Sequence, residues 1–202
     1  MIHKPKTRRG VETQEKILKA AEDCFAEKGY FQTGISDITR RAEIAPGTFY
    51  IYFEDKLSVF RYLMRELGHR LRGRIHLALE GCDTRVEIEE RGIRAFFEYV
   101  SEHTGLFRII WDAQFVDQEA FRAYYEGFAT AYARRLGEAR DAGQVRDLNM
   151  DALAYSLIGI NNFIALKYLI FDGTEVPESA IRTAIALLSD GALIGGPEPA
   201  PS

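Results

Sequence analysis

The chain has few of the residues on which disulfides, metal centres and many enzymes depend. Among its 202 residues there are two cysteines, Cys24 and Cys82, which are too few for a disulfide framework or a zinc site. Of the four histidines, His69 and His76 can share a helical face, but they lack the closer spacing of a known metal site. The GxSxG, Walker and dinucleotide-binding sequences are absent. We therefore expect no enzyme, no bound metal and no cofactor.

The chain also lacks segments typical of membrane insertion or export. No stretch approaches an uninterrupted transmembrane length, and the basic start MIHKPKTRRG is not followed by the apolar core of a signal peptide. Strand-like alternation and internal repeats are missing, whereas apolar residues recur at helical spacing throughout. These absences predict a cytoplasmic, all-α protein with no membrane partner.

An excess of positive charge is found only in the N-terminal third. The net charge is −4, yet residues 1–70 hold 13 Lys and Arg against 10 Asp and Glu, and the remainder hold 13 against 20. This division suggests a basic head that attracts phosphates, carried on an acidic body. Lys4, Lys6, Arg8 and Arg9 are predicted to lie on an unstructured arm, which either adds phosphate contacts or serves only solubility.

Residues 33–56 have the pattern of two short helices joined by a tight turn. Thr33 is a suitable N-cap for the first helix. The apolar side chains of Ile35, Ile38 and Ala42 are spaced three and four residues apart, so they share one face that should pack inward. The segment is therefore predicted to be a helix-turn-helix.

The second of these helices is predicted to present a polar face to solvent. Pro46 suits its first position, and Phe49 and Phe53 have the four-residue spacing of a buried stripe. Thr48, Tyr50 and Tyr52 are left facing outward, with no acidic residue before Glu54. Hydroxyl groups on an exposed helix without carboxylates can approach phosphates and base edges in the DNA major groove.

Lys56 and two arginines complete the predicted DNA surface. If Asp55 caps the next helix, the dipole disfavours Lys56 in its first turn by a few tenths of a kcal/mol, and a bound phosphate would reverse that effect. The alternative is a solvated lysine. Arg40 and Arg41 lie near a helix C-terminus, where the dipole stabilises them even without DNA. The predicted DNA contacts are Thr33, Arg40, Arg41, Pro46, Gly47, Thr48, Tyr50, Tyr52 and Lys56.

From about Thr13 to Leu63 the chain resembles the TetR family of bacterial transcriptional regulators. The matching residues are Gly29-Tyr30, Thr33, Asp37-Ile38, Ala42, Gly47-Thr48-Phe49-Tyr50, Tyr52-Phe53 and Lys56. The chain departs from the family pattern at Glu43, where Gly is usual, at Ala45, where Ser is usual, and at Tyr52, where His is commonest. Losing the Ser cap costs about 1 kcal/mol of helix stability, which a proline at the next position partly offsets.

The predicted domains are a helix-turn-helix head over residues 1–55, a helical ligand-binding and dimerisation domain over residues 56–194, and a disordered tail over residues 195–202. The predicted helices outside the head motif are Thr13–Lys28, Lys56 to about Leu79, Arg85–Glu102, Leu106–Phe115, Gln118–Ala142, Asp151–Phe171 and Glu178–Leu193.

Aromatic residues gathered in the body predict a ligand pocket. Most of them can simply be core, but polar residues within such a region need partners, and a few polar groups among aromatics are typical of a ligand cavity. The resemblance likewise implies an effector site here. The predicted ligand contacts are Phe97, Phe107, Trp111, Phe115, Tyr125, Phe128, Asn161 and Asn162. The asparagines have an alternative role in a helix–helix hydrogen bond.

This pocket has no nearby cluster of Lys or Arg, so we expect an apolar or aromatic effector. Either Arg94 or Arg108 could turn inward and pair a single carboxylate. The last two helices carry small and apolar residues, including Ala184, Leu188 and Gly191, which predict a two-fold homodimer built as a four-helix bundle. The alternative is that both helices are internal core.

Together these features predict a ligand-responsive homodimeric repressor that an apolar effector releases from a palindromic operator. A DNA-binding dimer without an effector, acting constitutively or architecturally, is the alternative.

Overall fold

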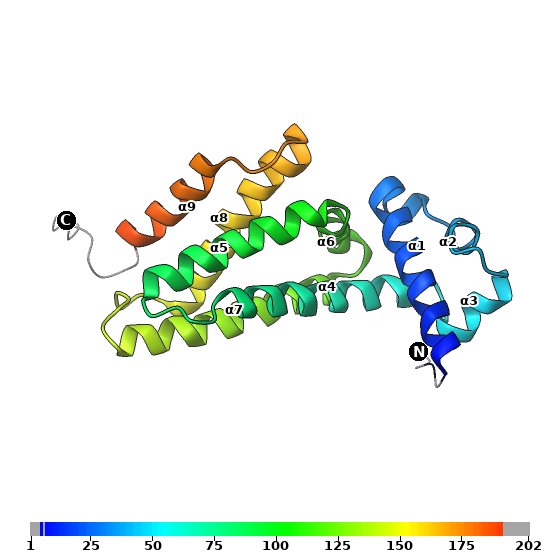
Figure 1. The fold of residues 1–202 in the computed structure, drawn as a ribbon, viewed down its shortest axis with the longest axis horizontal. Coiled ribbons are helices and arrows are strands. Elements are labelled where there is room, and N and C mark those ends of the chain that lie inside the picture. The colour runs from blue at the N-terminus through cyan, green and yellow to red at the C-terminus, as the bar shows by residue number, and fades with distance from the viewer. Residues whose placement is uncertain (1–4, 6, 192–202) are drawn as a thin grey trace. The chain divides into compact units, whose positions relative to one another are not determined.

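The computed structural model describes residue 5 and residues 7–191, and all its regular elements are helices, as predicted (Figure 1). Lys4, Lys6 and the predicted disordered tail lie outside the described residues. The elements are α1 (Arg8–Gln32), α2 (Ile35–Arg41), α3 (Pro46–Tyr52), α4 (Lys56–Ala78), α5 (Arg85–Glu102), α6 (Thr104–Val116), α7 (Gln118–Asp141), α8 (Met150–Ala165), the π-helix η1 (Leu166–Asp172) and α9 (Glu178–Gly191).

The start of α1 differs from the prediction. The helix begins at Arg8 and not at Thr13, and Thr7 is its N-cap, because the Thr7 hydroxyl oxygen accepts a hydrogen bond from the Gly10 N–H at 3.1 Å. Arg8 and Arg9 are therefore helical and do not lie on an unstructured arm. The predicted break at Gly29 is confirmed by its φ of 75°, a left-handed conformation that glycine adopts without steric cost.

The chain forms two compact units, and they do not follow the predicted boundary at residue 55. The first contains α1 to α3, α4 as far as His69, α6, and α7 as far as Tyr124. The second contains the rest of α4, α5, the rest of α7, and α8 to α9. Helix α6, predicted to belong to the ligand-binding body, therefore packs with the helix-turn-helix head.

In the first unit, α1 packs along α6 and an aromatic cluster closes the core. The ring centroids of Phe25, Tyr30 and Phe60 lie 5.0–5.7 Å apart. Burying an aromatic or aliphatic side chain of this size contributes about 1.5–3 kcal/mol. Gly105 on α6 lies so close to α1 that an added Cβ would stand 2.5 Å from the Ala26 Cβ. The α1–α6 contact thus depends on a residue without a side chain.

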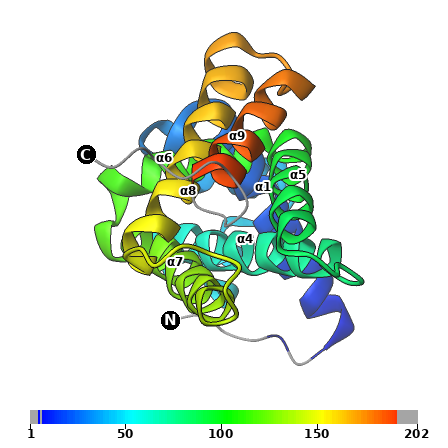
Figure 2. The same ribbon diagram turned by 90° about the vertical axis from the view of Figure 1, so that its left-hand side faces the viewer.

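In the second unit, α5, α8 and α9 pack against one another (Figures 1 and 2). Ala184 and Leu188 on α9 are buried within the single chain, with exposed fractions of 2% and 1%. The prediction that these two residues face a partner subunit is therefore wrong, because they are already used in the monomer core. Leu187 is a large apolar residue of this helix that is exposed, at 58%.

Helix α8 and its π-helical continuation η1 form one long apolar segment. Within Met150–Asp172 an 18-residue window has a mean hydropathy of 1.4, so the segment is long and apolar enough to span a bilayer by length and composition alone. Asn161, Asn162 and Lys167 interrupt this apolar character. Large apolar side chains are nevertheless exposed on α8, on η1 and on α9, and they are Tyr155, Phe163, Phe171 and Leu187.

Candidate nucleic-acid interface

Helix α3 presents a face that is open and free of acidic residues. Phe49 is fully buried, whereas Tyr50 is 55% exposed. A Cβ added at Gly47 would meet nothing within 4 Å, so the surface around the start of the helix is accessible. Pro46 is exposed. Of the three side chains predicted to face outward, only Tyr50 is exposed, and Thr48 and Tyr52 are half-buried.

Ile51 is an exposed α3 residue that the sequence analysis missed. Its side chain is 62% exposed, as much as that of a surface polar residue. It lies off the stripe formed by Phe49 and Phe53, and that offset was the signal that could have identified it. An apolar side chain here can contact a thymine methyl group if α3 lies in the major groove.

The turn between α2 and α3 is held in a left-handed conformation. Glu43 has φ 54°, and it is the one residue other than glycine with a positive φ among the described residues. The backbone N–H groups of Glu43 and Ile44 donate to the carbonyls of Arg40 and Thr39 at 3.2 and 3.1 Å. A side chain in this conformation costs about 1–2 kcal/mol, which explains why glycine is the natural choice at this position.

Thr33 does not cap α2 and has no free surface for DNA. The N-cap is Gly34, whose N–H donates to the Asp37 carboxylate at 2.9 Å. Thr33 is 1% exposed, and its hydroxyl lies 2.8 Å from the Gly29 carbonyl and 3.1 Å from the Cys24 carbonyl. The hydroxyl has one proton and donates to one of them at a time. Thr33 therefore closes the end of α1, and we no longer expect it to contact DNA.

The two predicted arginines have different surroundings. Both terminal nitrogens of Arg41 donate to the Glu27 carboxylate, at 2.8 and 2.5 Å, which ties α2 to α1 and lowers the pKa of Glu27. Arg40 has an exposed side chain, and its nearest carboxylate, that of Asp37, is 3.6 Å away. A surface pair of this kind contributes little. Arg40 can reach a phosphate, whereas Arg41 would first have to leave Glu27.

Lys56 is held inside the head by contacts with the backbone. Its ammonium donates to the carbonyls of Tyr30 and Thr33 at 2.7 and 2.8 Å, and it lies 4.1 Å from the centre of the Tyr30 ring. Burial lowers its pKa. Asp55 caps α4 as predicted, since its carboxylate accepts from the Ser58 N–H at 2.7 Å. Lys56 is thus neither a solvated lysine nor a free phosphate ligand, because two of its three N–H groups hold the α1–α2 junction.

Helix α6 also contacts the junction between α1 and α2. The Asp112 carboxylate accepts a hydrogen bond from the Tyr30 backbone N–H at 3.2 Å. Asp117, directly after α6, pairs with Arg61 on α4. Although Asp112 lies next to Trp111, a predicted ligand contact, its carboxylate holds the end of α1.

The predicted ligand contacts do not line the pocket that the structure describes. Phe107, Trp111 and Phe115 lie in the first unit, and the other five lie in the second. Phe115 is 76% exposed, and the Asn162 amide donates to the Ile158 carbonyl of its own helix at 2.8 Å. The remaining predicted contacts in the second unit are Phe97, Tyr125, Phe128 and Asn161.

Arg94 does not enter a pocket either. Its guanidinium forms two hydrogen bonds of 2.7 Å with the Glu178 carboxylate, which staples α5 to α9. Arg94, with Arg182, lowers the pKa of Glu178 to about 2. Arg108 is exposed on α6.

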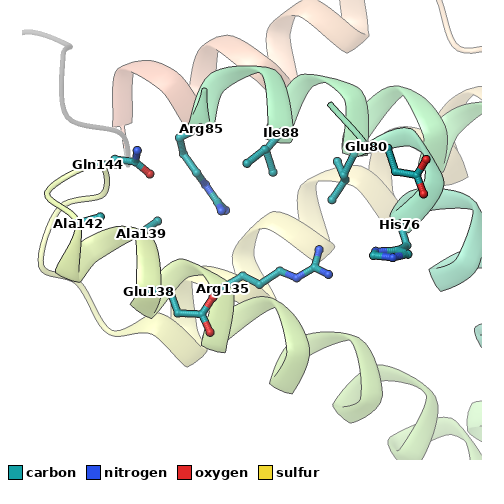
Figure 3. Close-up of a pocket in the computed structure, with 10 residues that line it drawn as sticks. His76, Glu80, Arg85, Ile88, Arg135, Glu138, Ala139, Ala142 and Gln144 are labelled. Carbon is teal, nitrogen blue, oxygen red and sulfur yellow. The ribbon is translucent and has the colours of Figure 1, made fainter. Parts of the chain in front are cut away.

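The described pocket, about 420 Å³ in volume, lies within the second unit (Figure 3). It is formed by the end of α4, the start of α5, the end of α7 and the loop after α7. It is more polar than the predicted aromatic cavity, because Arg85 and Arg135 are among its lining residues. Among the described residues, no group of three or more His, Cys, Asp and Glu side chains is placed to hold a metal ion.

Comparisons with known proteins agree with this architecture. Residues 17–63 match the family described as bacterial regulatory proteins, tetR family. The chain is 25% identical over 193 residues to the HTH-type transcriptional regulator YdgC of Bacillus subtilis, covering 93% of this chain and 96% of the relative.

Two solved structures have the same fold. The fatty acid degradation regulator FadR of Bacillus halodurans matches with a TM-score of 0.81 and 20% identity, over 93% of this chain and 98% of that one. A TetR family transcription regulator of Marinobacter aquaeolei matches with a TM-score of 0.77 and 17% identity, over 92% and 98%. At these identities the structural likeness shows the fold alone.

Proposed function

Because this chain is a TetR-family helix-turn-helix transcriptional regulator and not an enzyme, we propose that it is a homodimeric repressor that a small effector releases from a palindromic operator. The observation that carries the proposal is the face of α3, where Gly47, Tyr50 and Ile51 are exposed and no carboxylate is present. Such a face can enter a major groove without repelling phosphates. We infer that the protein acts in the cytoplasm, where it meets DNA.

The contacts would divide between positioning and reading. Arg40 and the hydroxyl of Tyr50 are suited to phosphate oxygens, which fix the register of the helix on the duplex. Ile51 is suited to a thymine methyl group, which carries sequence information. Lys56 contributes indirectly, because it fixes the junction that orients α2 and α3 on α1.

Dimerisation is supported by the apolar side chains exposed on α8, η1 and α9. Phe163, Phe171 and Leu187 are 65%, 71% and 58% exposed in the single chain. A second copy would bury the same face by two-fold symmetry. Two α3 helices then enter successive major grooves about 34–36 Å apart, which requires an inverted-repeat operator.

Effector control would pass through α6. Its Asp112 holds the Tyr30 N–H at the end of α1, and the helix packs on α1 at Gly105. An effector that binds better when α6 is displaced would shift the population away from the DNA-competent head. Linkage then requires DNA to weaken effector binding by the same factor.

The test is operator affinity measured by fluorescence anisotropy over a range of salt concentrations. Tyr50→Glu places a carboxylate on the α3 face and should abolish specific binding. Arg40→Gln should lower the slope of log K against log salt by about one unit. Arg134→Gln on α7, an exposed arginine outside the head, is the matched control. Wild-type affinity in both head variants would refute the assignment of α3.

A further inference from the structure

The pocket in the second unit combines an apolar floor with two inward-pointing cations. Leu79, Ile88 and Ala139 supply apolar surface from three elements. Figure 3 shows the side chain of Arg85 descending from α5 and that of Arg135 extending from α7 into the same space. Charged side chains seldom converge on a cavity without a partner of opposite charge.

Arg85 is buried and only partly satisfied. Its side chain is 8% exposed, and a terminal nitrogen pairs with the Glu89 carboxylate, which also accepts the hydroxyl proton of Tyr132. The Arg85 Nε–H is buried and has no hydrogen-bond partner in the described part of the chain. A guanidinium has five N–H donors, and Glu89 is already shared with Tyr132. The wall of the pocket therefore contains a buried guanidinium whose donors are not all satisfied by the protein.

Arg135 supplies the second donor group. It lines the pocket from α7, is partly buried, and forms no ion pair within residues 7–191. Its neighbour Arg134 instead pairs with Glu138 at 2.9 Å. Arg135 thus remains available to an incoming anion, which it and the Arg85 guanidinium could hold by charge-assisted hydrogen bonds.

The acidic residues of the pocket limit the charge of that anion. Glu80 and Glu138 also line it, so a phosphate or dicarboxylate would meet carboxylates as well as arginines. A ligand with one carboxylate and a short apolar body fits this pocket. Its carboxylate can pair with the arginines, and its apolar body can pack on Leu79, Ile88 and Ala139. We infer that this pocket binds a small organic monocarboxylate through Arg85 and Arg135. The inference rests on the proposed function only in that this ligand would be the effector.

Binding should be measured on the DNA-free protein by titration calorimetry. The probes are hexanoate, benzoate and phenylacetate, their three primary amides, and phenyl phosphate. At least one carboxylate should bind at up to millimolar concentration, and its amide and the phosphate should bind more weakly. Arg135→Gln should weaken that carboxylate about 10- to 100-fold. Arg74→Gln, an α4 arginine paired with Glu102 outside the pocket, should leave the affinity unchanged.

Arg85→Gln alone would leave Glu89 buried without its cation, so the second variant is the double change Arg85→Gln with Glu89→Gln. It should also lose the carboxylate while keeping the helical signal of the wild type. Equal affinity for acid and amide, tighter binding of phenyl phosphate, no binding of any carboxylate, or full affinity in Arg135→Gln would each overturn the assignment.

Operator release separates this inference from the proposed function. If a carboxylate binds through Arg135 but leaves the operator complex intact, the pocket assignment stands and its role as the effector site fails. If another compound releases the operator equally from wild type and Arg135→Gln, the proposed effector-controlled regulator is supported, but this pocket is not its effector site.

Discussion

Replacing Gly105 by Ala tests the contact that joins α6 to the head. The added Cβ would lie 2.5 Å from the Ala26 Cβ, whereas ordinary contacts of this kind begin at 3.4 Å. Both atoms belong to short side chains fixed to helix backbones, so neither can turn aside. The two helices would have to separate locally by close to an ångström, and overpacking of this kind typically costs about 1–3 kcal/mol.

The measurement is the free energy of unfolding from urea denaturation, followed by far-UV circular dichroism. Gly137→Ala on α7 is the control, because a Cβ there would meet nothing within 4 Å. The same change of residue should stabilise α7 by about 0.5–1 kcal/mol, since glycine is unfavourable inside a helix. If Gly105→Ala is as stable as the control, the close α1–α6 contact does not exist in solution and the coupling through α6 loses its basis.

Four further changes have defined outcomes. Lys56→Met should lower the free energy of unfolding by about 1–3 kcal/mol through two lost hydrogen bonds, with no change in the salt slope of DNA binding. Glu43→Gly should stabilise the protein by about 1 kcal/mol by relieving the left-handed turn. Because Arg94 holds the pKa of Glu178 at about 2, that carboxylate stabilises the fold fully above pH about 4.5, and the contribution falls away as the pH drops toward 2. Glu178→Gln should remove this part of the pH dependence of unfolding. Leu187→Arg should convert the proposed dimer to a folded monomer in sedimentation experiments, because Leu187 is exposed in the single chain.

The contrary results are equally specific. If Lys56→Met lowers the slope of log K for DNA binding against log salt by about one unit, the Lys56 ammonium contacts a DNA phosphate after all. If Glu43→Gly is less stable than wild type, a contact of the Glu43 side chain stabilises the fold by more than the left-handed backbone conformation costs. If wild type and Glu178→Gln unfold identically in acid, the Arg94–Glu178 ion pair does not stabilise the packing of α5 against α9. A Leu187→Arg protein that stays dimeric would move the interface elsewhere.

Local patterns in the sequence predicted the helices well, because helix formation depends on spacing over one or two turns. The predicted segment Arg85–Glu102 has the same bounds as α5, and Asp55 caps α4 as expected. The predicted start of α1 at Thr13 was wrong because Thr7 and Thr13 are equally good N-caps by local sequence rules.

Partners far apart in the sequence could not be predicted in this way. Lys56 is 26 residues from Tyr30 and Asp112 is 82 residues away, yet both hold the same turn of backbone. The pocket was missed for a related reason. Aromatic content indicates core as readily as cavity, whereas the informative residues are Arg85 and Arg135, which look like ordinary surface charges until α5 and α7 are brought together.

The central claim is that α3 reads an inverted-repeat operator, and sequencing the genomic DNA fragments retained by the purified wild-type protein tests it most directly. Tyr50→Glu is carried through the same selection. The account predicts that wild type enriches one motif with two-fold symmetry and half-sites about one helical turn apart, and that the variant enriches none. Enrichment of the same motif by Tyr50→Glu, or no symmetric motif with wild type, would contradict it.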